Sequence, residues 1–293
     1  MDIRPFGTTG LRVSALGYGA GNIGTAQMSE GDVARLLGAV LDAGVTLIDT
    51  ARSYGASEER IGRHLAHRRS EFLLSTKVGY GVEGFEDWTG PCVQAGIERA
   101  LRTLRTEVID IVHLHSCDVQ TLRHGGVVEA LWRAKQAGQV RVVAYSGEGD
   151  ALAEAIDAGL LESLQASINV CDQRIVDHAL GRAKARGMGV LAKRPLANAP
   201  WRWDARPTAP DAALYWDRWQ AMRLGELGIE PSELALRFAA WTWGVDCCMV
   251  ATTRHEHLHA NVAAVERGKL PDDVVQELRE RFRRHDRGWV GVI

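Results

Sequence analysis

The sequence predicts a (β/α)8 TIM barrel with an N-terminal β-hairpin and an added C-terminal helix. Short β-branched runs alternate with segments of helical periodicity over most of the 293 residues. This alternation requires parallel strands joined by crossover helices. Counting the runs gives eight strands, the number that closes a barrel of this class. Polar residues also follow several of the strands, as expected where loops form the mouth of a barrel.

The chain begins with two short alternating segments around Gly7-Thr8-Thr9-Gly10, which predict the hairpin over 3–6 and 11–15. Barrel strands are expected at 15–19, 45–48, 72–76, 108–114, 140–145, 164–168, 189–192 and 248–252. Helices between them are expected at 32–43, 58–66, 93–104, 128–137, 152–158 and 176–186. A last helix at 272–285 should pack on the barrel through the apolar stripe of Val274, Val275, Leu278 and Phe282.

One segment interrupts this rhythm. Residues 196–210 are rich in Pro, Ala and Trp, and they are too many for an ordinary βα connection. We expect an active-site loop there. No linker or second core is evident elsewhere, and barrels of ~250 residues fold as one unit. Residues 1–293 are therefore predicted to form a single domain.

The composition excludes several classes of protein. A content of 46% hydrophobic and 25% charged residues is typical of a soluble globular chain. The net charge of -2 argues against nucleic acid or an anionic membrane as a partner and favours a small molecule. Five cysteines without a CxxC pair are expected to be reduced thiols of a cytoplasmic protein. The absence of a leader-like segment and of a run of 18 apolar residues argues against export or a membrane span.

Four residues with reactive side chains follow three consecutive predicted strands. Asp49 and Tyr54 follow the second barrel strand, Lys77 the third and His115 the fourth. The carboxyl ends of parallel strands meet at one mouth, so an acid, a phenol, an amine and an imidazole should converge there. Each of them alone would more often be a helix cap, a solvated side chain or a rim residue. Four in consecutive units favour a catalytic site.

These residues and their spacing resemble the aldo-keto reductase family. The family pattern is Asp-Thr-Ala-x-x-Tyr, then Thr-Lys-Val, then Asp five residues before His. It is matched here by Asp49, Tyr54, Lys77, Asp110 and His115. The resemblance extends over nearly the whole chain, from residues 10–19 through Gln165 to residues 256–261. It implies an (α/β)8 barrel that reduces aldehydes or ketones with NADPH, or catalyses the reverse oxidation.

The chemistry of the side chains supports the same reaction independently. Carbonyl reduction needs a hydride at carbon and a proton at oxygen, and Tyr54 could supply the proton if a cation lies nearby. Lys77 is that cation, and Asp49 would hold it as an ammonium. His115 would donate a hydrogen bond that orients the substrate oxygen beside Tyr54. This arrangement requires no metal ion and no covalent intermediate.

The resemblance also implies a cofactor site. It places Ser146 and Gln165 on the nicotinamide carboxamide, although Gly147 stands where the family commonly has Asn. Lys193 replaces the tyrosine that usually stacks on the nicotinamide. The other candidates are Gly19 and Ala20 in the first βα loop, Arg194, Pro195 and Leu196 after the seventh strand, and Thr253, Arg254, His257 and Asn261 after the last. The last four match the segment that grips the 2'-phosphate and adenine, so NADPH is preferred to NADH.

Two roles are open for Lys193. Its ammonium could lie beside the nicotinamide and repel NADP+ more than neutral NADPH. It could instead turn outward to the pyrophosphate and leave Arg194 free to meet the substrate. Substrate contacts are expected from Trp88, Trp201 and Trp203, which favour an apolar or aromatic aldehyde or a flat sugar face. The same tryptophans could merely pack the long loop.

Two short motifs suggest other ligands. The glycine-rich segment 17–21 imitates a dinucleotide fingerprint, but its third glycine falls at the wrong spacing. We interpret it as part of the first βα loop. His255 and His259 satisfy the zinc motif HExxH, which a chain with ten histidines meets easily by chance. No metal site is predicted.

Two other functions use the same barrel. A Schiff-base lyase would use Lys77 or Lys193, but it leaves Tyr54 and the phosphate-binding segment unexplained. A nucleotide-binding redox sensor, similar to the potassium-channel β-subunit branch of the family, would keep the same residues and act through partners. Fast turnover of a simple carbonyl would argue against this alternative.

Overall fold

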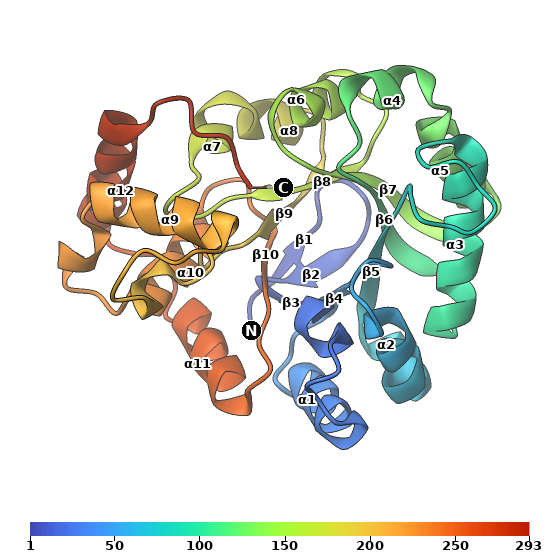
Figure 1. Ribbon diagram of the computed structural model, residues 1–293, viewed down its shortest axis with the longest axis horizontal. Coiled ribbons are helices and arrows are strands. Elements are labelled where there is room, and N and C mark those ends of the chain that lie inside the picture. Colours follow the sequence, from blue (N-terminus) through green and yellow to red (C-terminus); the bar gives the residue numbers. More distant parts are fainter. Residues whose placement is uncertain (293) are drawn as a thin grey trace.

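The computed structural model, which describes residues 1–292, contains eight parallel strands that close into a barrel (Figure 1). The strands run in the order β10-β3-β4-β5-β6-β7-β8-β9. Their bounds are β3 Leu16–Gly19, β4 Leu47–Asp49, β5 Leu73–Val78, β6 Ile109–His115, β7 Val140–Ser146, β8 Ser163–Ser167, β9 Gly189–Lys193 and β10 Cys247–Val250. The predicted (β/α)8 architecture is confirmed.

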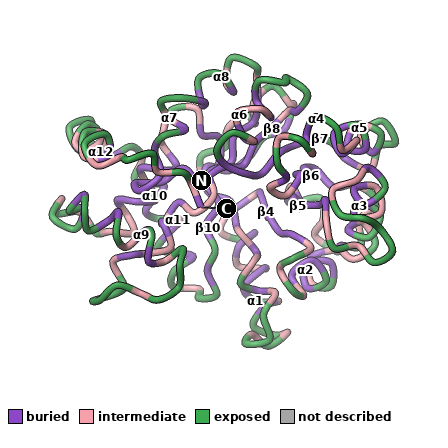
Figure 2. The backbone as a smooth tube through the Cα atoms, turned by 45° about the horizontal axis from the view of Figure 1, so that its top comes forward, coloured by how far each residue is buried: buried purple, intermediate pink, exposed green. Residues whose placement is uncertain are grey.

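Helices cover the outside of this barrel in the alternation that the sequence predicts. They are α1 Glu30–Asp42, α2 Ser57–Leu65, α3 Gly90–Leu104, α4 Val119–His124, α5 Val127–Gln136, α6 Gly149–Asp157, α7 Arg174–His178, α8 Leu180–Ala185, α9 Pro210–Ala221, α10 Pro231–Trp241, α11 His255–Glu266 and α12 Asp272–His285. Figure 2 shows the consequence for burial: the strands and the inner faces of the helices are buried, whereas outer faces and loops are exposed.

The prediction of a single helix at 176–186 is wrong, because two shorter helices, α7 and α8, replace it. Ala179, with φ of -128° and ψ of -30°, ends α7, and α8 starts at the next residue. Both Ile175 and Leu180 are buried. A straight helix would place residues five apart about 140° from each other around its axis, so one of the two would face away from the core. The break lets both side chains pack inward.

The N-terminal hairpin covers one end of the barrel. β1 (Ile3–Pro5) pairs antiparallel with β2 (Arg12–Ser14), and Figure 1 shows the pair lying across the centre of the barrel. Phe6 follows β1, is fully buried and belongs to a cluster with barrel residues such as Ile111 and Leu191. A Cβ at Gly189 would lie 2.6 Å from the Phe6 ring. This position of β9 therefore needs glycine, because any side chain would clash with the ring.

A second apolar cluster lies beside the barrel. It joins α9, α10 and α12 through buried side chains that include Tyr215, Trp219, Phe238, Leu278 and Phe282. The C-terminal helix is therefore present as predicted, but its stripe packs mainly on this added layer. The helices α9 and α10 follow the long loop 196–210, and the periodicity analysis had not assigned them.

None of the helices within residues 1–292 has the length and apolar composition needed to cross a membrane. In the part of the chain that the structure describes, the five cysteines are all buried and none of them forms a disulfide. Unpaired thiols agree with the interpretation of the cysteines as reduced.

The role of the hairpin can be tested with Phe6→Ala. Removing this fully buried ring leaves a cavity at the closed end of the barrel, and we expect the free energy of unfolding to fall by about 3–5 kcal/mol. The matched control is Phe85→Ala, because the Phe85 side chain is 44% exposed and should change stability by less than about 0.5 kcal/mol. Urea unfolding measures both. Equal small losses would show that the hairpin is not part of the cooperative core.

Candidate active site

Neighbouring strands bring the four predicted catalytic residues to one mouth. Asp49 ends β4, Lys77 lies near the end of β5 and His115 ends β6, while Tyr54 lies in the loop between β4 and α2. The four line a common cavity of about 320 Å³. Residues of the next strands line the same cavity, because the parallel register places them beside His115. His115 pairs with Ser146, Ser146 pairs with Gln165, and Ser167 of β8 pairs with Lys193 of β9.

Lys77 and Asp49 form a buried ion pair. Lys77 Nζ lies 2.6 Å from Asp49 Oδ2 and also donates to the Thr50 carbonyl at 2.8 Å. Ser75 Oγ donates to Asp49 Oδ1 at 2.7 Å. Burial alone would raise the pKa of Asp49, but the Lys77 ammonium and these hydrogen bonds outweigh it, so the pKa is lowered. Burial likewise opposes charge on Lys77, yet Asp49 and Tyr54 raise its pKa. Both partners are therefore ionised at neutral pH.

Tyr54 is placed beside this pair by the glycine-rich first loop. Lys77 Nζ lies 4.9 Å from the centroid of the Tyr54 ring. A Cβ at Gly24 would lie 1.6 Å from the Tyr54 carbonyl oxygen, and one at Gly21 would touch the ring at 3.5 Å. The loop backbone can approach Tyr54 this closely only because it lacks a side chain at Gly24. Gly21 and Gly24 thus serve packing around Tyr54.

His115 is held by a residue that the sequence analysis missed. Tyr80, in the loop after β5, places its hydroxyl 3.0 Å from His115 Nδ1 and its ring 5.6 Å from the imidazole in a stacked arrangement. Tyr54 meets the imidazole edge-on at 6.2 Å. Burial, and then the Lys77 cation, lower the pKa of His115 to about 3. The imidazole is therefore neutral at physiological pH.

His113 lies one inward-facing position below His115 on β6. It is fully buried, and neither of its ring nitrogens has a hydrogen-bond partner within residues 1–292. Burial lowers its pKa to about 4. The sequence analysis assigns no role to His113, because a strand-end histidine and a core histidine look alike in sequence.

Ser146 and Gln165 lie together in the cavity. Ser146 Oγ donates to Gln165 Oε1 at 3.1 Å, whereas Gln165 Nε2 is buried and has no partner among the described residues. Gly147 follows Ser146, and a Cβ there would lie 2.5 Å from the Tyr145 hydroxyl. The Tyr145 hydroxyl is itself anchored to the Cys117 carbonyl at 2.6 Å. Tyr145 therefore occupies the space that a side chain at position 147 would need.

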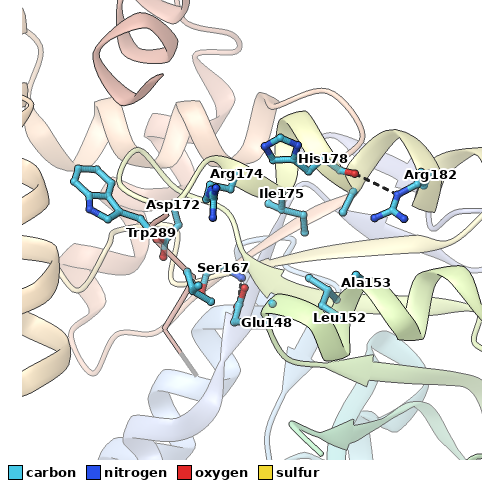
Figure 3. A pocket seen from close by; sticks show the side chains of 14 residues that line it. Glu148, Leu152, Ala153, Ser167, Asp172, Arg174, Ile175, His178, Arg182 and Trp289 are labelled. Atoms are coloured by element: carbon cyan, nitrogen blue, oxygen red, sulfur yellow. Dashed lines mark hydrogen bonds between the residues drawn. The ribbon is translucent and has the colours of Figure 1, made fainter. Parts of the chain in front are cut away.

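Lys193 pairs with Glu148, a partner that is not part of the nicotinamide or the pyrophosphate interpretation of this lysine. Its Nζ lies 3.2 Å from Oε1 of the buried Glu148, which also accepts the Ser167 N–H at 2.7 Å. Lys193 lines the cavity of the four catalytic candidates, whereas Glu148 lines a second cavity of about 340 Å³ between α6, α7 and residues 289–291 (Figure 3). A Cβ at Gly291 would lie 2.4 Å from Glu148 Oε2, so the C-terminal tail passes directly over this carboxylate.

A third cavity adjoins the cavity around Tyr54 at the mouth of the barrel. It measures about 450 Å³ and shares Asn22, Arg194, Met249 and Ala251 with the cavity around Tyr54, so the two form one groove. Arg194, Pro195 and Leu196 all line it, together with Asn198 and Arg202 from the long loop. Gly19 lines the first cavity, whereas Ala20 is fully buried and lines neither.

The remaining cofactor candidates lie where β10 leads into α11. Arg254 caps α11 with its backbone, and its side chain is 67% exposed. Thr253 precedes it, His257 lies in the first turn, and Asn261 is buried further along the helix. None of these four side chains lines the two cavities of the groove. Within residues 1–292 no group of three or more His, Cys, Asp or Glu side chains is arranged to share a metal ion.

The three tryptophans predicted to meet substrate lie outside the groove. Trp88 packs on Tyr80 with ring centroids 5.3 Å apart, and Trp201 packs on Trp219 at 5.1 Å in the second apolar cluster. Trp203 is 38% exposed and lies under the Arg202 guanidinium. Each of them thus has a packing partner. The cavity around Tyr54 is lined mainly by polar residues, whereas Leu196, Met249 and Val250 add apolar surface in the adjoining cavity.

Comparison with known proteins agrees with this architecture. The model of the Aldo/keto reductase family matches residues 15–281, and the chain belongs to that family. The family consists of oxidoreductases that act on carbonyl or alcohol groups, generally with a nicotinamide cofactor. The resemblance seen in the sequence is thereby confirmed.

Relatives and solved structures match most of the chain. An L-galactose dehydrogenase of Arabidopsis thaliana is 26% identical over 90% of this chain and 88% of its own length. An L-glyceraldehyde 3-phosphate reductase of Escherichia coli K12 is 31% identical over 67% of this chain and 62% of its own. An aldo-keto reductase of Bacillus halodurans, solved in its holo form, superposes with a TM-score of 0.83 at 25% identity and covers 96% of each chain.

The two neutral histidines predict how stability depends on pH. Their folded-state pKa values, about 4 for His113 and about 3 for His115, lie below the ordinary value of 6.5. The unfolded chain therefore binds protons that the folded chain does not, and stability present above pH 6.5 is lost on acidification. We expect the free energy of unfolding to fall by about 2 kcal/mol per histidine between pH 7 and pH 5.

Urea unfolding at pH 7, 6 and 5 measures this dependence. His113→Gln removes one of the two groups and should lose about half of the pH dependence that the unmodified chain shows. Free energies of unfolding that stay constant between pH 7 and pH 5 would contradict the assignment of two buried neutral imidazoles.

Proposed function

We propose that the protein reduces an aldehyde or ketone to an alcohol with NADPH, or catalyses the reverse oxidation. One observation carries this proposal: Tyr54, the Lys77–Asp49 ion pair and a neutral His115 line a single cavity at the mouth of the barrel. A proton donor, a buried cation and a neutral hydrogen-bond donor are the groups that carbonyl reduction requires.

Each residue has a separate part in the chemistry. Tyr54 gives its hydroxyl proton to the substrate oxygen, and the Lys77 ammonium stabilises the phenolate that remains. Asp49 keeps Lys77 charged and fixes the direction of its Nζ. The N–H of neutral His115 binds the carbonyl oxygen and orients it toward Tyr54. Because Lys77 is held as an ammonium, it cannot serve as the amine nucleophile that a Schiff-base lyase needs.

The groove contains groups that fit a nicotinamide dinucleotide. Gln165 Nε2 is a buried donor that has no partner within residues 1–292, as a carboxamide-binding residue would be. Arg194, Asn198 and Arg202 in the adjoining cavity suit a pyrophosphate, and the exposed Arg254 at the start of α11 suits a 2'-phosphate. When bound, NADPH would supply the hydride.

The substrate is proposed to be a small hydroxylated carbonyl compound or sugar. The groove is lined by Asn22, Ser116 and Arg194 rather than by the tryptophans. The relatives named for L-galactose and for L-glyceraldehyde 3-phosphate support the same class. Buried free thiols support a cytoplasmic location.

A regulatory, nucleotide-binding role is the second candidate. A probable voltage-gated potassium channel subunit beta of rice is 35% identical over 41% of this chain. Steady NADPH oxidation at 340 nm across a panel of aldehydes, ketones and sugars distinguishes the two roles. Nucleotide binding without turnover of any of them would favour the regulatory one.

The first test of the proposed reaction is Tyr54→Phe. Only the hydroxyl is removed, so we expect turnover to fall by about 10² to 10⁴, the contribution of a general acid. NADPH affinity, measured by fluorescence titration, should stay within about twofold, since a neutral ring remains. A variant that retains more than half of the original turnover would show that Tyr54 is not the acid.

Arg254→Ala tests the choice of cofactor. The side chain is exposed, so its loss should not disturb the fold, while a charge-assisted bond to a 2'-phosphate would disappear. We expect NADPH binding to weaken by about 1.5–3 kcal/mol, or roughly 10- to 150-fold, and NADH binding to change little. Equal losses for both nucleotides would mean that Arg254 does not contact the phosphate.

A further inference from the structure

The loop between β5 and α3 is built to hold Tyr80 in one place. The Tyr80 carbonyl accepts from Arg52 Nε at 3.1 Å, and the next residue, Gly81, donates its N–H to Asp87 at 2.6 Å. The Trp88 N–H closes the loop by donating to the Gly79 carbonyl at 2.6 Å.

The Trp88 ring supports the same loop from the side. It packs on Tyr80 and lies so close to Gly79 that a Cβ there would be 2.3 Å from the indole. Gly79 also has a φ of +133°, which residues with a side chain rarely adopt. These contacts fix the Tyr80 ring on a loop that would otherwise be free to move.

Tyr80 meets His115 through two kinds of contact. The rings stack, and the Tyr80 hydroxyl lies 3.0 Å from Nδ1. Among residues 1–292 this is the only hydrogen bond of either side chain, so His115 Nε2 lines the cavity without a protein partner. Nδ1 is therefore engaged by the protein, and Nε2 is the ring nitrogen left for a ligand in the cavity.

We infer that Tyr80 is a positioning residue that fixes His115 as the tautomer with its proton on Nε2. A neutral imidazole has one donor and one acceptor nitrogen, and the hydrogen bond made by one decides the role of the other. We assign the phenol as the donor, because its proton has no other acceptor among residues 1–292. Nδ1 is then the acceptor, and Nε2 carries the proton. His115 then presents an N–H, not a lone pair, to a substrate oxygen.

This inference rests on the proposed function only for its consequence in catalysis. A carbonyl oxygen accepts hydrogen bonds. In the tautomer with the proton on Nδ1, the lone pair of Nε2 would face this oxygen and could not form a hydrogen bond to it. Holding the productive tautomer before substrate arrives avoids a rearrangement at the moment of reaction. Tyr80 itself has no contact with the reacting atoms in this scheme.

The test reads the tautomer directly. Histidine is labelled with ¹⁵N, and two-bond ¹H–¹⁵N spectra of the full chain without nucleotide are recorded at pH 7, with His115→Gln used for assignment. We expect the His115 signals of a protonated Nε2 and an unprotonated Nδ1. In Tyr80→Phe, which keeps the stacked ring and removes only the hydroxyl, they should move toward a mixture of both tautomers. With a carbonyl substrate, kcat/KM should fall about three- to tenfold while NADPH affinity stays within twofold.

Two further variants make the result specific. Tyr18→Phe also removes a buried hydroxyl, one that donates to the Thr252 carbonyl at 2.8 Å, and it should leave the His115 signals unchanged. Trp88→Leu keeps the hydroxyl but removes the support of the Tyr80 ring, so it should produce the mixture even if Tyr80→Phe fails to fold.

A proton on Nδ1 in the unmodified chain would overturn the inference, as would identical His115 signals in the unmodified chain, Tyr80→Phe and Trp88→Leu. If the chain turns over no carbonyl compound, the proposed function fails, yet the spectra still decide the role of Tyr80.

Discussion

The mouth of the barrel depends on the buried ion pair between Lys77 and Asp49. An unpaired charge in this position would cost several kcal/mol, so each partner needs the other and further hydrogen bonds as well. Lys77 also donates to the Thr50 carbonyl, and Asp49 also accepts from Ser75. These groups come from the ends of β4 and β5, which pair in parallel. Correct register of the two strands is thus a condition for an ionised site.

The charge of Lys77 shapes the groups around it. Together with burial it keeps His113 and His115 neutral, and it lies against the Tyr54 ring. A second lysine, Lys193, enters the same cavity and pairs with Glu148, which lies on the side of the C-terminal tail. This pair forms the wall between the groove and the cavity under the C-terminal tail. Burial lowers the pKa of Lys193, and the neighbouring Glu148 carboxylate opposes this shift.

Much of the fold could be predicted from the sequence. The alternation of β-branched runs and amphipathic segments indicated eight strands, and the hairpin followed from its glycine-flanked turn. Strand ends differ from the prediction by a few residues at most, as for β10. The break at Ala179 and the helices α9 and α10 were missed. Their periodicity is weak because they pack partly on other helices, and the direction of that packing depends on residues far along the chain.

Which side chains reach the mouth follows from the sequence alone, since residues at the ends of parallel strands must meet there. That reasoning placed Asp49, Lys77 and His115. The contacts of each residue, in contrast, depend on how distant segments pack together. Tyr80 reaches His115 from a loop, and Glu148, which follows β7, reaches Lys193 of β9 across the end of β8. Trp88, Trp201 and Trp203 are turned toward packing partners. Strand ends are positioned by a repeated hydrogen-bond ladder that local patterns reveal. Loop side chains are positioned by individual contacts between distant segments, which no local pattern encodes.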